Sequence, residues 1–452
     1  MEGTLWKTVL TVALLLTGCA VGVAAVPHSS ASYAAGIILD FGGYDIDYMG
    51  LEDSGENAVS ALDSICAGKG YEVVYSEGSS VPSSVNSLPA SGSSASWSLF
   101  VTYTGDTGWT RWSGDPADVS VGDFAAVCWG LCGEGEYPTP GVDATGTCYY
   151  GYGQCMRIVS MSPSCTETIA AAGAEGLIVA TDSYSNYPVS VTEGKKNGSI
   201  SEIGGYTNPS FETVAAQNPD LVIGMGDQSV HLSIIGKMRT QGVNCLAVYD
   251  ASTVEEIEVN TYMIGVACGY EMHSVQTIGQ IQDALDELAS LVSAGSTDSG
   301  VMVALSSAKS PWVAGGSTYV SDVIARAACS NVYSSLRGWV QVNSETVAEY
   351  NPKCIIVVSS DYECSESGYS KMLSSLSAEW RSTDAYADGN IYLLTDGATD
   401  LASRPSTRIA QFEELMCRIL QPAIFTDIEI PHWIGDDYTD YLTYTAELGF
   451  AS

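Results

Sequence analysis

The amino-acid sequence predicts an α/β protein with two similar lobes, preceded by a small α+β domain. Residues 205–223 (GYTNPSFETVAAQNPDLVI) recur 133 positions later as residues 338–356 (GWVQVNSETVAEYNPKCII). From about residue 156 onward, short apolar strands alternate with helical patterns, whereas residues 35–145 combine one amphipathic helix with several strands. The repeat and the alternation together predict the fold class.

Each copy of the repeat has the pattern of a short helix followed by a buried strand. Glu212 and Glu345 fall in the first turns of the two helices, and an Asn-Pro pair then stops each helix. Tyr206 and Trp339 lie on glycine-supported turns before the helices. Two copies of one unit predict two Rossmann-like lobes, whose equivalent tips each carry an aromatic ring and a carboxylate.

Length and charge exclude several classes of partner. The 452 residues are enough for two or three domains with cores of their own. Lysine and arginine number 17 against 53 aspartates and glutamates, a formal net charge of -36. This charge repels nucleic acid, so we expect no DNA or RNA partner.

The spacing of the cysteines does not indicate a metal site, and it does not fix which cysteines pair in disulfides. No CxxC pair or Cys/His cluster has the spacing of a zinc site, so no metal is expected. Three pairs are near enough in sequence to be candidate disulfides: Cys128–Cys132, Cys148–Cys155 and Cys354–Cys364. Four others lie on predicted helices and are expected to be buried apolar side chains: Cys165, Cys268, Cys329 and Cys417.

The N-terminus has the features of an export signal. Residues 1–26 combine Lys7 with a long apolar run, and the sequence LTGC ending at Cys19 resembles a lipoprotein cleavage box. Lipidation of Cys19, ordinary cleavage after Ala25 and an uncleaved anchor all remain open. Each places the protein outside the cytoplasm, and the first and third tether it to the membrane at the cell surface.

The rest of the chain divides into segments of distinct character. In the first lobe, Ser162 or Ser164 is expected to cap a helix, with Glu167 completing a capping box from Ser164 and Gly173 ending the helix. Residues 141–155, rich in Gly and Tyr, are predicted to be a linker. The expected domains are a signal or anchor (1–26), a small α+β domain (35–145), a first lobe (156–250), an inter-lobe helix (251–296), a second lobe (297–422) and a C-terminal extension (423–452).

The N-terminal part resembles a small domain of vitamin carriers. A helix from Glu56, the GDTGWTRW hairpin and the strand VGDFAAVCWG, read as a small antiparallel sheet, are similar to the α+β domain at the C-terminus of transcobalamin and intrinsic factor. In those carriers this domain helps to cover bound cobalamin. The alternative is a structural spacer.

The remainder, roughly residues 156–422, resembles the substrate-binding proteins of ABC importers for cobalamin, haem and ferric siderophores. The motifs are RIVSMSPSCTE, TDSYSNYP, IGGYTNPSFE and NPDLVI, followed by PWVAGGSTYVSDVIARA, RGWVQVNSE and DLASRPSTRIAQ. The resemblance implies a helical-backbone periplasmic-binding-protein fold with ligand held between the lobes. It also implies an ABC permease and its ATPase as partners, which Glu212 and Glu345 engage through permease arginines. The alternative for these glutamates is stabilisation of their own helices.

The ligand is expected to contact aromatic rings at the lobe tips. The candidate ligand-binding residues are Tyr184, Tyr206, Trp312, Trp339 and Arg404. Their flat rings suit a large ring system, while Arg404 has the alternative role of bracing Asp396 or Asp400. The basic residues near the predicted cleft are few, namely Lys309, Arg337 and Arg404, whereas ferric siderophores and haem usually need several. A corrinoid such as cobalamin therefore comes first, a ferric siderophore second and haem third, as transported ligand and not as resident cofactor.

An enzymatic role is not expected. Cys165, near a helix N-terminus, has no His or Asp partner in any recognisable motif. A surface adhesion or scaffold protein is a further alternative, but it leaves the duplicated lobe motifs without a purpose.

Overall fold

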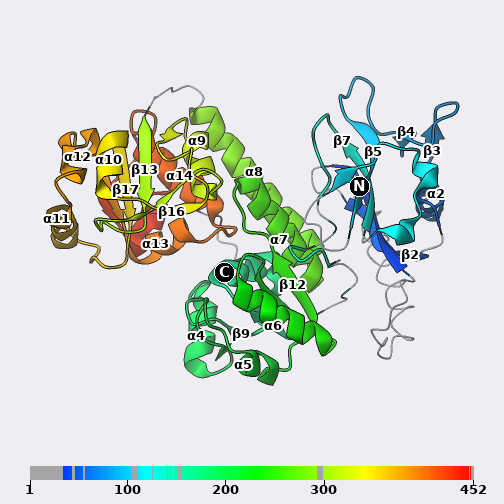
Figure 1. Cartoon of the computed structure of the whole chain (residues 1–452), viewed down its shortest axis with the longest axis horizontal. Helices are drawn as coiled ribbons and strands as arrows, with labels where there is room; N and C mark the ends of the chain where they lie inside the picture. Colours follow the sequence, from blue (N-terminus) through cyan, green and yellow to red (C-terminus); the bar gives the residue numbers. More distant parts are fainter. Residues whose placement is uncertain are drawn as a thin grey trace.

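The computed structural model confirms the predicted fold class (Figure 1). A small domain with an N-terminal sheet precedes two lobes, and the long helix α8 (Glu271–Val292) runs between the lobes. The described residues are 34–42, 46–53, 56–103, 109–124, 126–139, 141, 143–147, 149, 152, 155–292, 299–446 and 448. Within them, none of the helices combines the length and apolar composition needed to cross a membrane.

The N-terminal domain packs one helix on a five-stranded sheet. Its strand order is β2-β1-β7-β5-β6, with a separate β3-β4 hairpin. The bounds are β1 (Ala34–Asp40), β2 (Ile46–Asp53), α2 (Ala58–Lys69), β3 (Val73–Tyr75), β4 (Pro82–Val85), β5 (Ser96–Thr102), β6 (Thr110–Arg111) and β7 (Ala126–Cys132). The expected antiparallel sheet is wrong in one respect, since β1 and β7 are parallel. A parallel pair needs a long crossover, and the chain that includes α2 supplies it.

The second face of this sheet contacts the first lobe. Ile38, Phe100, Cys128 and Cys132 cluster there, and Val266 of helix α7 (Val254–Cys268), which lies against the first lobe, packs on them. The proposed Cys128–Cys132 disulfide is wrong, because both thiols are free. Residues four apart on a strand are separated by about 13 Å, well beyond the reach of a disulfide.

The first lobe is an all-parallel sheet of order β10-β9-β8-β11-β12. Its strands are β8 (Ile158–Ser160), β9 (Ile178–Thr181), β10 (Ser201–Glu202), β11 (Leu221–Met225) and β12 (Asn244–Val248). Its helices are α3 (Pro163–Ile169), α4 (Val189–Asn197), α5 (Phe211–Ala216) and α6 (Ser229–Thr240). Gly173 (φ 85°) ends the helical segment after α3, as predicted.

The second lobe is a mixed sheet of order β16-β14-β13-β17-β18-β19, with β15 paired to β13. Its strands are β13 (Gly300–Ala304), β14 (Trp312–Ala314), β15 (Ser330–Asn331), β16 (Trp339–Gln341), β17 (Cys354–Val358), β18 (Ile391–Leu394) and β19 (Trp433–Ile434). Its helices are α9 (Tyr319–Arg326), α10 (Ser344–Tyr350), α11 (Glu366–Ser375), α12 (Asp384–Ala387), α13 (Asp396–Ser403) and α14 (Ile409–Leu420). Among the described strands of this lobe, only the pairs β13–β14 and β14–β16 are antiparallel.

The sequence repeat occupies equivalent places in the two lobes. Helix α5 leads into β11 beside β8, and α10 leads into β17 beside β13. Both helices stop where predicted, because Asn218 and Asn351 adopt left-handed conformations (φ 48° and 44°) before a proline. The internal repeat is thus a structural one.

The expected single helix over 251–296 is wrong, because the chain forms two helices. Helix α7 (Val254–Cys268) ends at Gly269 in a left-handed cap, and α8 folds back along α7. A Cβ on Gly265 would lie 2.2 Å from Ser274 Oγ, so glycine permits the close approach of the two helices. Helix α8 then joins the lobes: Thr277 bonds Ala171 of the first lobe at 3.0 Å, and Leu288 enters the core of the second.

The predicted linker 141–155 is partly packed on the first lobe. The buried Asp143 accepts hydrogen bonds from Arg239 Nη2 at 2.6 Å and from the backbone N–H of Ala247 at 2.9 Å. Tyr149 is also buried. Cys148, and with it the proposed Cys148–Cys155 pair, lies outside the described residues.

The C-terminal extension belongs to the second lobe. Strand β19 lies beside β18, and the buried Glu414 accepts hydrogen bonds from the backbone N–H groups of residues 443–445 and from Arg418. The proposed Cys354–Cys364 disulfide is wrong, because both thiols are free. Cys354 begins β17, whereas Cys364 follows the other end of that strand and lies near Gly435.

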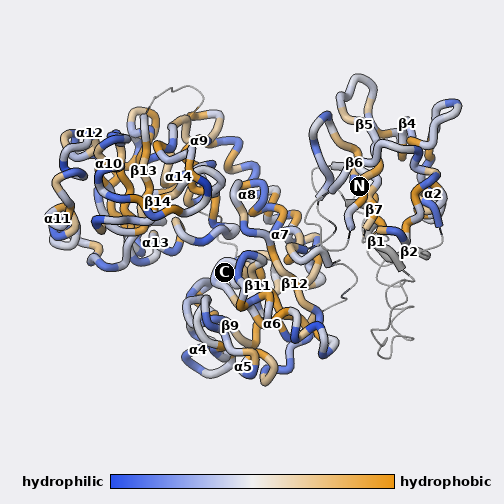
Figure 2. Tube along the Cα trace, in the orientation of Figure 1, coloured by the Kyte–Doolittle hydropathy of each residue, from blue (hydrophilic) through white to orange (hydrophobic). Residues whose placement is uncertain are grey.

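The distribution of polarity explains how a chain of charge -36 folds. Figure 2 shows apolar strands inside each lobe and hydrophilic residues along the outer helices. Five apolar residues at helical spacing in the sequence are expected to be core positions of α8. Ile278, Ile281, Leu285 and Leu288 are at most 2% exposed, whereas Leu291 is half-buried against the same core. The acidic excess must therefore lie mainly at the surface, where carboxylates repel one another.

This repulsion predicts salt-dependent stability. The screening length falls from about 10 Å at 0.1 M salt to about 3 Å at 1 M, so repulsion between surface carboxylates weakens. We expect the midpoint of thermal unfolding, measured by circular dichroism, to rise as KCl increases over this range. An unchanged or falling midpoint would show that surface repulsion does not limit stability.

Candidate functional site

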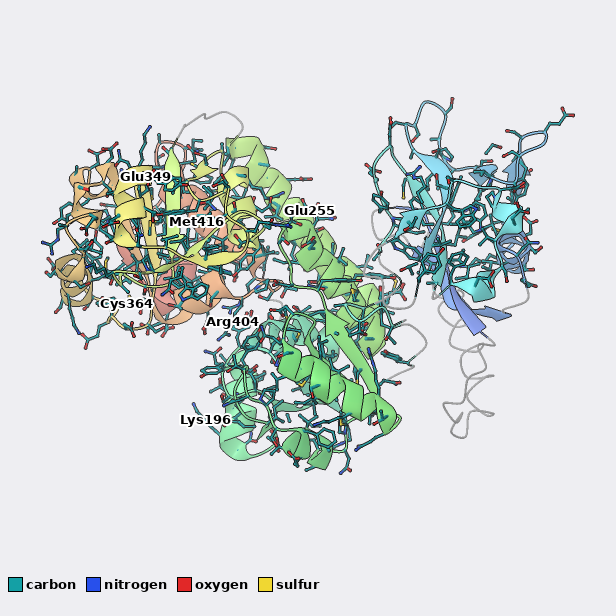
Figure 3. All side chains as sticks on the ribbon, in the orientation of Figure 1. Lys196, Glu255, Glu349, Cys364, Arg404 and Met416 are labelled. Carbon is teal, nitrogen blue, oxygen red and sulfur yellow. The ribbon has the colours of Figure 1, made fainter. Side chains whose placement is uncertain are left out.

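The two lobes meet at the carboxyl ends of their sheets. The loop after β9 provides Asn186, whose Nδ2 donates to Asp400 Oδ2 of α13 at 2.7 Å. Figure 3 shows Arg404 at this meeting point, on the segment between α13 and α14. Open α/β sheets bind their ligands beyond the carboxyl ends of the strands, so this edge is the candidate site.

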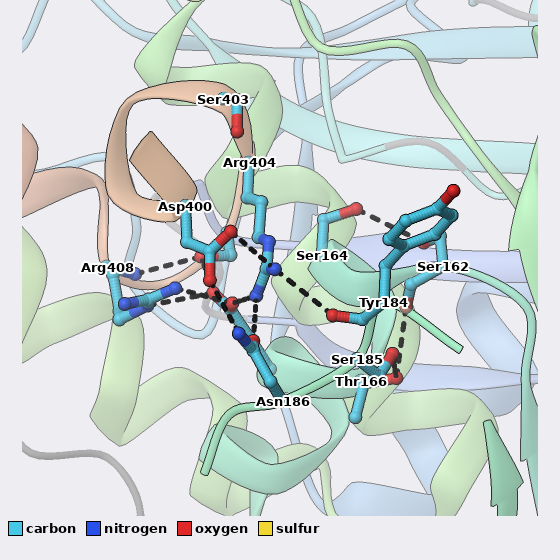
Figure 4. A network of polar contacts seen from close by, with 12 residues as sticks. Ser162, Ser164, Thr166, Tyr184, Ser185, Asn186, Asp400, Ser403, Arg404 and Arg408 are labelled. Carbon is cyan, nitrogen blue, oxygen red and sulfur yellow. Dashed lines mark hydrogen bonds and ion pairs between the residues drawn. The ribbon is translucent and has the colours of Figure 1, made fainter. Parts of the chain in front are cut away.

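A buried carboxylate, Glu167 of α3, joins the lobes. Figure 4 shows two of its partners, Arg404 and Arg408, beside Asp400 and Asn186. Glu167 is 2% exposed. Arg404 Nη1 and Arg408 Nη2 donate to Oε1 at 2.8 and 2.6 Å. Arg408 Nε and Ser406 Oγ donate to Oε2 at 2.9 and 2.6 Å. Three side chains of the second lobe thus converge on one carboxylate of the first.

These contacts keep Glu167 ionised. Burial alone would raise its pKa, but Arg408, with its hydrogen bonds, and then Arg404 outweigh burial and lower the pKa. Arg408 is itself held in place, because Tyr187 lies under its guanidinium at 4.3 Å and Tyr438 Oη accepts from Nη1 at 3.3 Å. Residue 438 belongs to the C-terminal extension, so that extension supports the contact between lobes.

The predicted capping box at this helix is wrong. Ser162 is the N-cap, and its Oγ accepts from the backbone N–H of Cys165 at 3.2 Å. Glu167 therefore lies beyond the first turn, and its side chain points across to the second lobe instead of back to Ser164. Cys165 is buried, and burial raises the pKa of its thiol to about 12, which disfavours a reactive thiolate.

Arg404 has the bracing role that was the alternative to ligand binding. Besides Glu167, it forms an ion pair with Asp400 at 2.7 Å and donates to Asn186 Oδ1 at 2.7 Å and to the carbonyl oxygen of Tyr184 at 3.2 Å. Only 9% of the residue is exposed. Its effect on a ligand would therefore come mainly from fixing the Tyr184 loop.

The four predicted aromatics differ in exposure. Tyr184 is 63% exposed and Trp312 is 49% exposed, so both offer ring surface at the edge between the lobes. Tyr206 is half-buried, and its ring meets that of His231 edge-on at 5.3 Å. Trp339 is also half-buried, packed on the core of the second lobe, and lies diagonally from Trp312 on the paired strands β14 and β16.

Acidic residues follow two strands of the first lobe at the same edge. Asp227 comes after β11 and Asp250 comes after β12. Burial, followed by the charges of Asp227 and Glu256, raises the pKa of Asp250. Lys309 and Arg337, the other basic candidates from the sequence, are exposed on the second lobe. The charges of the Glu167 cluster cancel, because it contains two carboxylates, Glu167 and Asp400, and two arginines, Arg404 and Arg408.

Glu212 and Glu345 are exposed in the first turns of α5 and α10. Ser210 Oγ donates to Glu212 Oε2 at 3.0 Å, a local contact within the helix start. The repeat places the two carboxylates at equivalent positions of the two lobes.

Sequence reasoning missed the partners of Glu167. Arg408 lies in the quoted segment DLASRPSTRIAQ, but nothing local in the sequence links it to a residue 241 positions away. The available signal was a single charged residue, Glu167, in an otherwise uncharged helical segment. Cys19, the predicted lipidation site, lies outside the described residues.

The buried ion-pair cluster predicts a pH-dependent loss of stability in Glu167→Gln. The amide cannot neutralise Arg404 and Arg408, and breaking a buried ion pair in this way costs about 3–5 kcal/mol. Because the pKa of Glu167 is lowered by folding, its contribution is fully present above the unfolded value of about 4.3 and is lost as pH falls through the folded value. Urea unfolding of both proteins from pH 7 to pH 3 measures this difference.

The exposed Glu366 of α11 provides the matched control, since Glu366→Gln should change the free energy of unfolding little. A wild-type stability advantage that is absent at pH 7, or that stays constant down to pH 3, would contradict the assignment.

Comparison with known proteins agrees with this architecture. The periplasmic binding protein family matches residues 158–398, more than half of the chain. The uncharacterized ABC transporter substrate-binding lipoprotein YvrC of Bacillus subtilis is 24% identical over 60% of this chain and 82% of its own length. A cobalamin-binding protein of Halobacterium salinarum is 21% identical over 61% of this chain and 72% of its own length.

Solved structures share the fold of the two lobes. A periplasmic haem-binding protein from Pseudomonas aeruginosa superimposes with a TM-score of 0.52 at 20% identity, over 60% of this chain and 94% of its own. The family match does not reach residues 35–145, so the similarity of that part to transcobalamin stays a prediction. The resemblance of the two lobes is confirmed, and this chain belongs to the periplasmic binding protein family.

Proposed function

We propose that this protein is the extracytoplasmic solute-binding component of an ABC importer, and that it captures a corrinoid between its lobes. The observation that carries the ligand class is the charge of the inter-lobe edge. The ion pairs around Glu167 leave no net positive charge, and Asp227 and Asp250 add negative charge on the first lobe. The exposed rings of Tyr184 and Trp312 offer flat apolar surface.

This combination favours a neutral ring system with amide-bearing edges. A corrinoid presents carboxamide N–H groups, which carboxylates such as Asp227 and Asp250 accept well. Haem propionates and anionic iron chelates would instead meet like charges. The relative named as cobalamin-binding supports the same choice, whereas the haem-binding neighbour supports the alternative.

A ferric siderophore or haem is the second candidate ligand. It would depend on Lys309 and Arg337, which are exposed on the second lobe and have no part in the Glu167 cluster. In either case the mechanism is capture without chemical conversion, and the ligand is cargo. Delivery to a permease and its ATPase, and attachment to the membrane through Cys19 or an uncleaved signal, complete the proposal.

Ligand titration tests the proposal directly. Tryptophan fluorescence of the purified protein should be quenched saturably by cobalamin and cobinamide, but not by haem or a ferric siderophore. Tyr184→Ala and Trp312→Ala should each weaken corrinoid binding about tenfold, because each removes an exposed ring from the edge. Selective quenching by haem or the iron chelate would move the protein to the second candidate class.

A matched control uses Tyr386, which is 37% exposed on α12 at the far end of the second lobe (Figure 1). Tyr386→Ala should leave the affinity unchanged. Equal losses in all three variants would show that the rings act only through general stability.

Docking to the permease is tested by charge reversal at both lobes. The double variant Glu212→Lys, Glu345→Lys should abolish uptake in cells and leave ligand affinity in solution intact, since both side chains are exposed and neither is among the partners of Glu167. The control reverses Glu193 of α4 and Glu366 of α11, one exposed glutamate from each lobe. Normal uptake by the first double variant would exclude the docking role.

A further inference from the structure

His231 of α6 lies at the inter-lobe edge with both ring nitrogens engaged by backbone groups. It is fully buried. Nδ1 lies 3.1 Å from the backbone nitrogen of Met225, and Nε2 lies 2.8 Å from the carbonyl oxygen of Tyr206. A backbone N–H only donates and a carbonyl only accepts. The ring must therefore be neutral, with its proton on Nε2.

This histidine holds Tyr206 in two ways. The Nε2–H bond fixes the backbone of Tyr206, and the two rings meet edge-on at 89° with their centroids 5.3 Å apart. Met225, the donor to Nδ1, is the last residue of β11. His231 thus fixes the position of the Tyr206 turn relative to the end of a central strand.

A role as core filler alone does not explain this arrangement. An apolar side chain would fill the same volume without the desolvation of two polar nitrogens. The two hydrogen bonds instead join the strand end to a turn that no β-ladder connects to it. Their effect is on the position of Tyr206.

We propose that His231 is a positioning residue for ligand capture, which holds the Tyr206 ring at the inter-lobe edge through its Nε2–H. The inference rests on the proposed function, because it assigns Tyr206 to ligand contact. It makes the bond to the Tyr206 carbonyl oxygen, and not the bond to Met225, the one that ligand affinity depends on.

Two conservative variants separate these bonds. In His231→Gln the side-chain amide reaches the place of Nε2 and can donate to Tyr206, but the acceptor for Met225 is lost. In His231→Asn the amide oxygen takes the place of Nδ1 and can accept from Met225, but the donor to Tyr206 is lost. Each variant leaves one backbone group unsatisfied, so both should lose similar stability.

The expected result is a difference in affinity at similar unfolding temperature. With cobalamin as the probe, His231→Gln should bind within about threefold of wild type, whereas His231→Asn should bind roughly tenfold more weakly. Equal affinities in two variants of similar stability, or the reverse order, would overturn the inference.

Two-bond ¹H–¹⁵N spectra of the histidine rings distinguish this inference from the proposed function. The chain has four histidines, and the signals that vanish in His231→Gln identify His231. A neutral ring protonated at Nε2 at pH 7 supports the inference, and a charged or Nδ1–H ring overturns it. If wild-type protein binds neither corrinoid, haem nor iron chelate, the proposed function fails, while the spectrum still decides the state of His231.

Discussion

A carboxylate buried between two lobes has to be neutralised across the interface, and Glu167 imposes this constraint on the whole structure. Its two oxygens receive four hydrogen bonds, all from the segment between α13 and α14. Moving a charge out of water costs free energy, and only well-placed ionic and hydrogen-bonding partners offset that cost. The surroundings provide that placement: Tyr187 and Tyr438 hold Arg408, while Asp400 and Asn186 hold Arg404.

The same cluster sets the limits of lobe motion. The lobes are joined once by the α7–α8 hairpin and again by the Glu167 cluster, so any opening has to pivot about these connections or break buried ion pairs. Rotation of the lobes is therefore expected to be small, with packed helices sliding only slightly past one another. Arg404 also bonds the Tyr184 loop, which couples the most exposed ring of the site to the cluster.

Local patterns in the sequence correctly predicted those features of the fold that depend on residues close together in the chain. The repeat, the Asn-Pro helix stops and the buried face of α8 depend on neighbouring residues, and the structure has them as expected. Glu167 was misassigned because its spacing from Ser164 fits a capping box, while its true partners lie far along the chain. The break at Gly269 was missed because apolar residues continue on both sides of it. The segment around Asp143 was predicted to be a linker because of its composition. It is packed instead because Arg239, which is distant in the sequence, bonds to Asp143 in the folded chain.

Charge acts on two length scales in this protein. The net charge of -36 gives a field that repels any anion at low ionic strength, but salt shortens its range to a few ångströms. The charges of the Glu167 cluster are largely buried and are screened less, whereas Asp227 and Asp250 are exposed to the salt. An anionic ligand would therefore meet repulsion during approach and again beside Asp227 and Asp250, whereas a neutral ligand meets neither. Selection against anions at high salt would then rest on the Glu167 cluster, whose buried arginines are all paired with carboxylates and leave no spare positive charge.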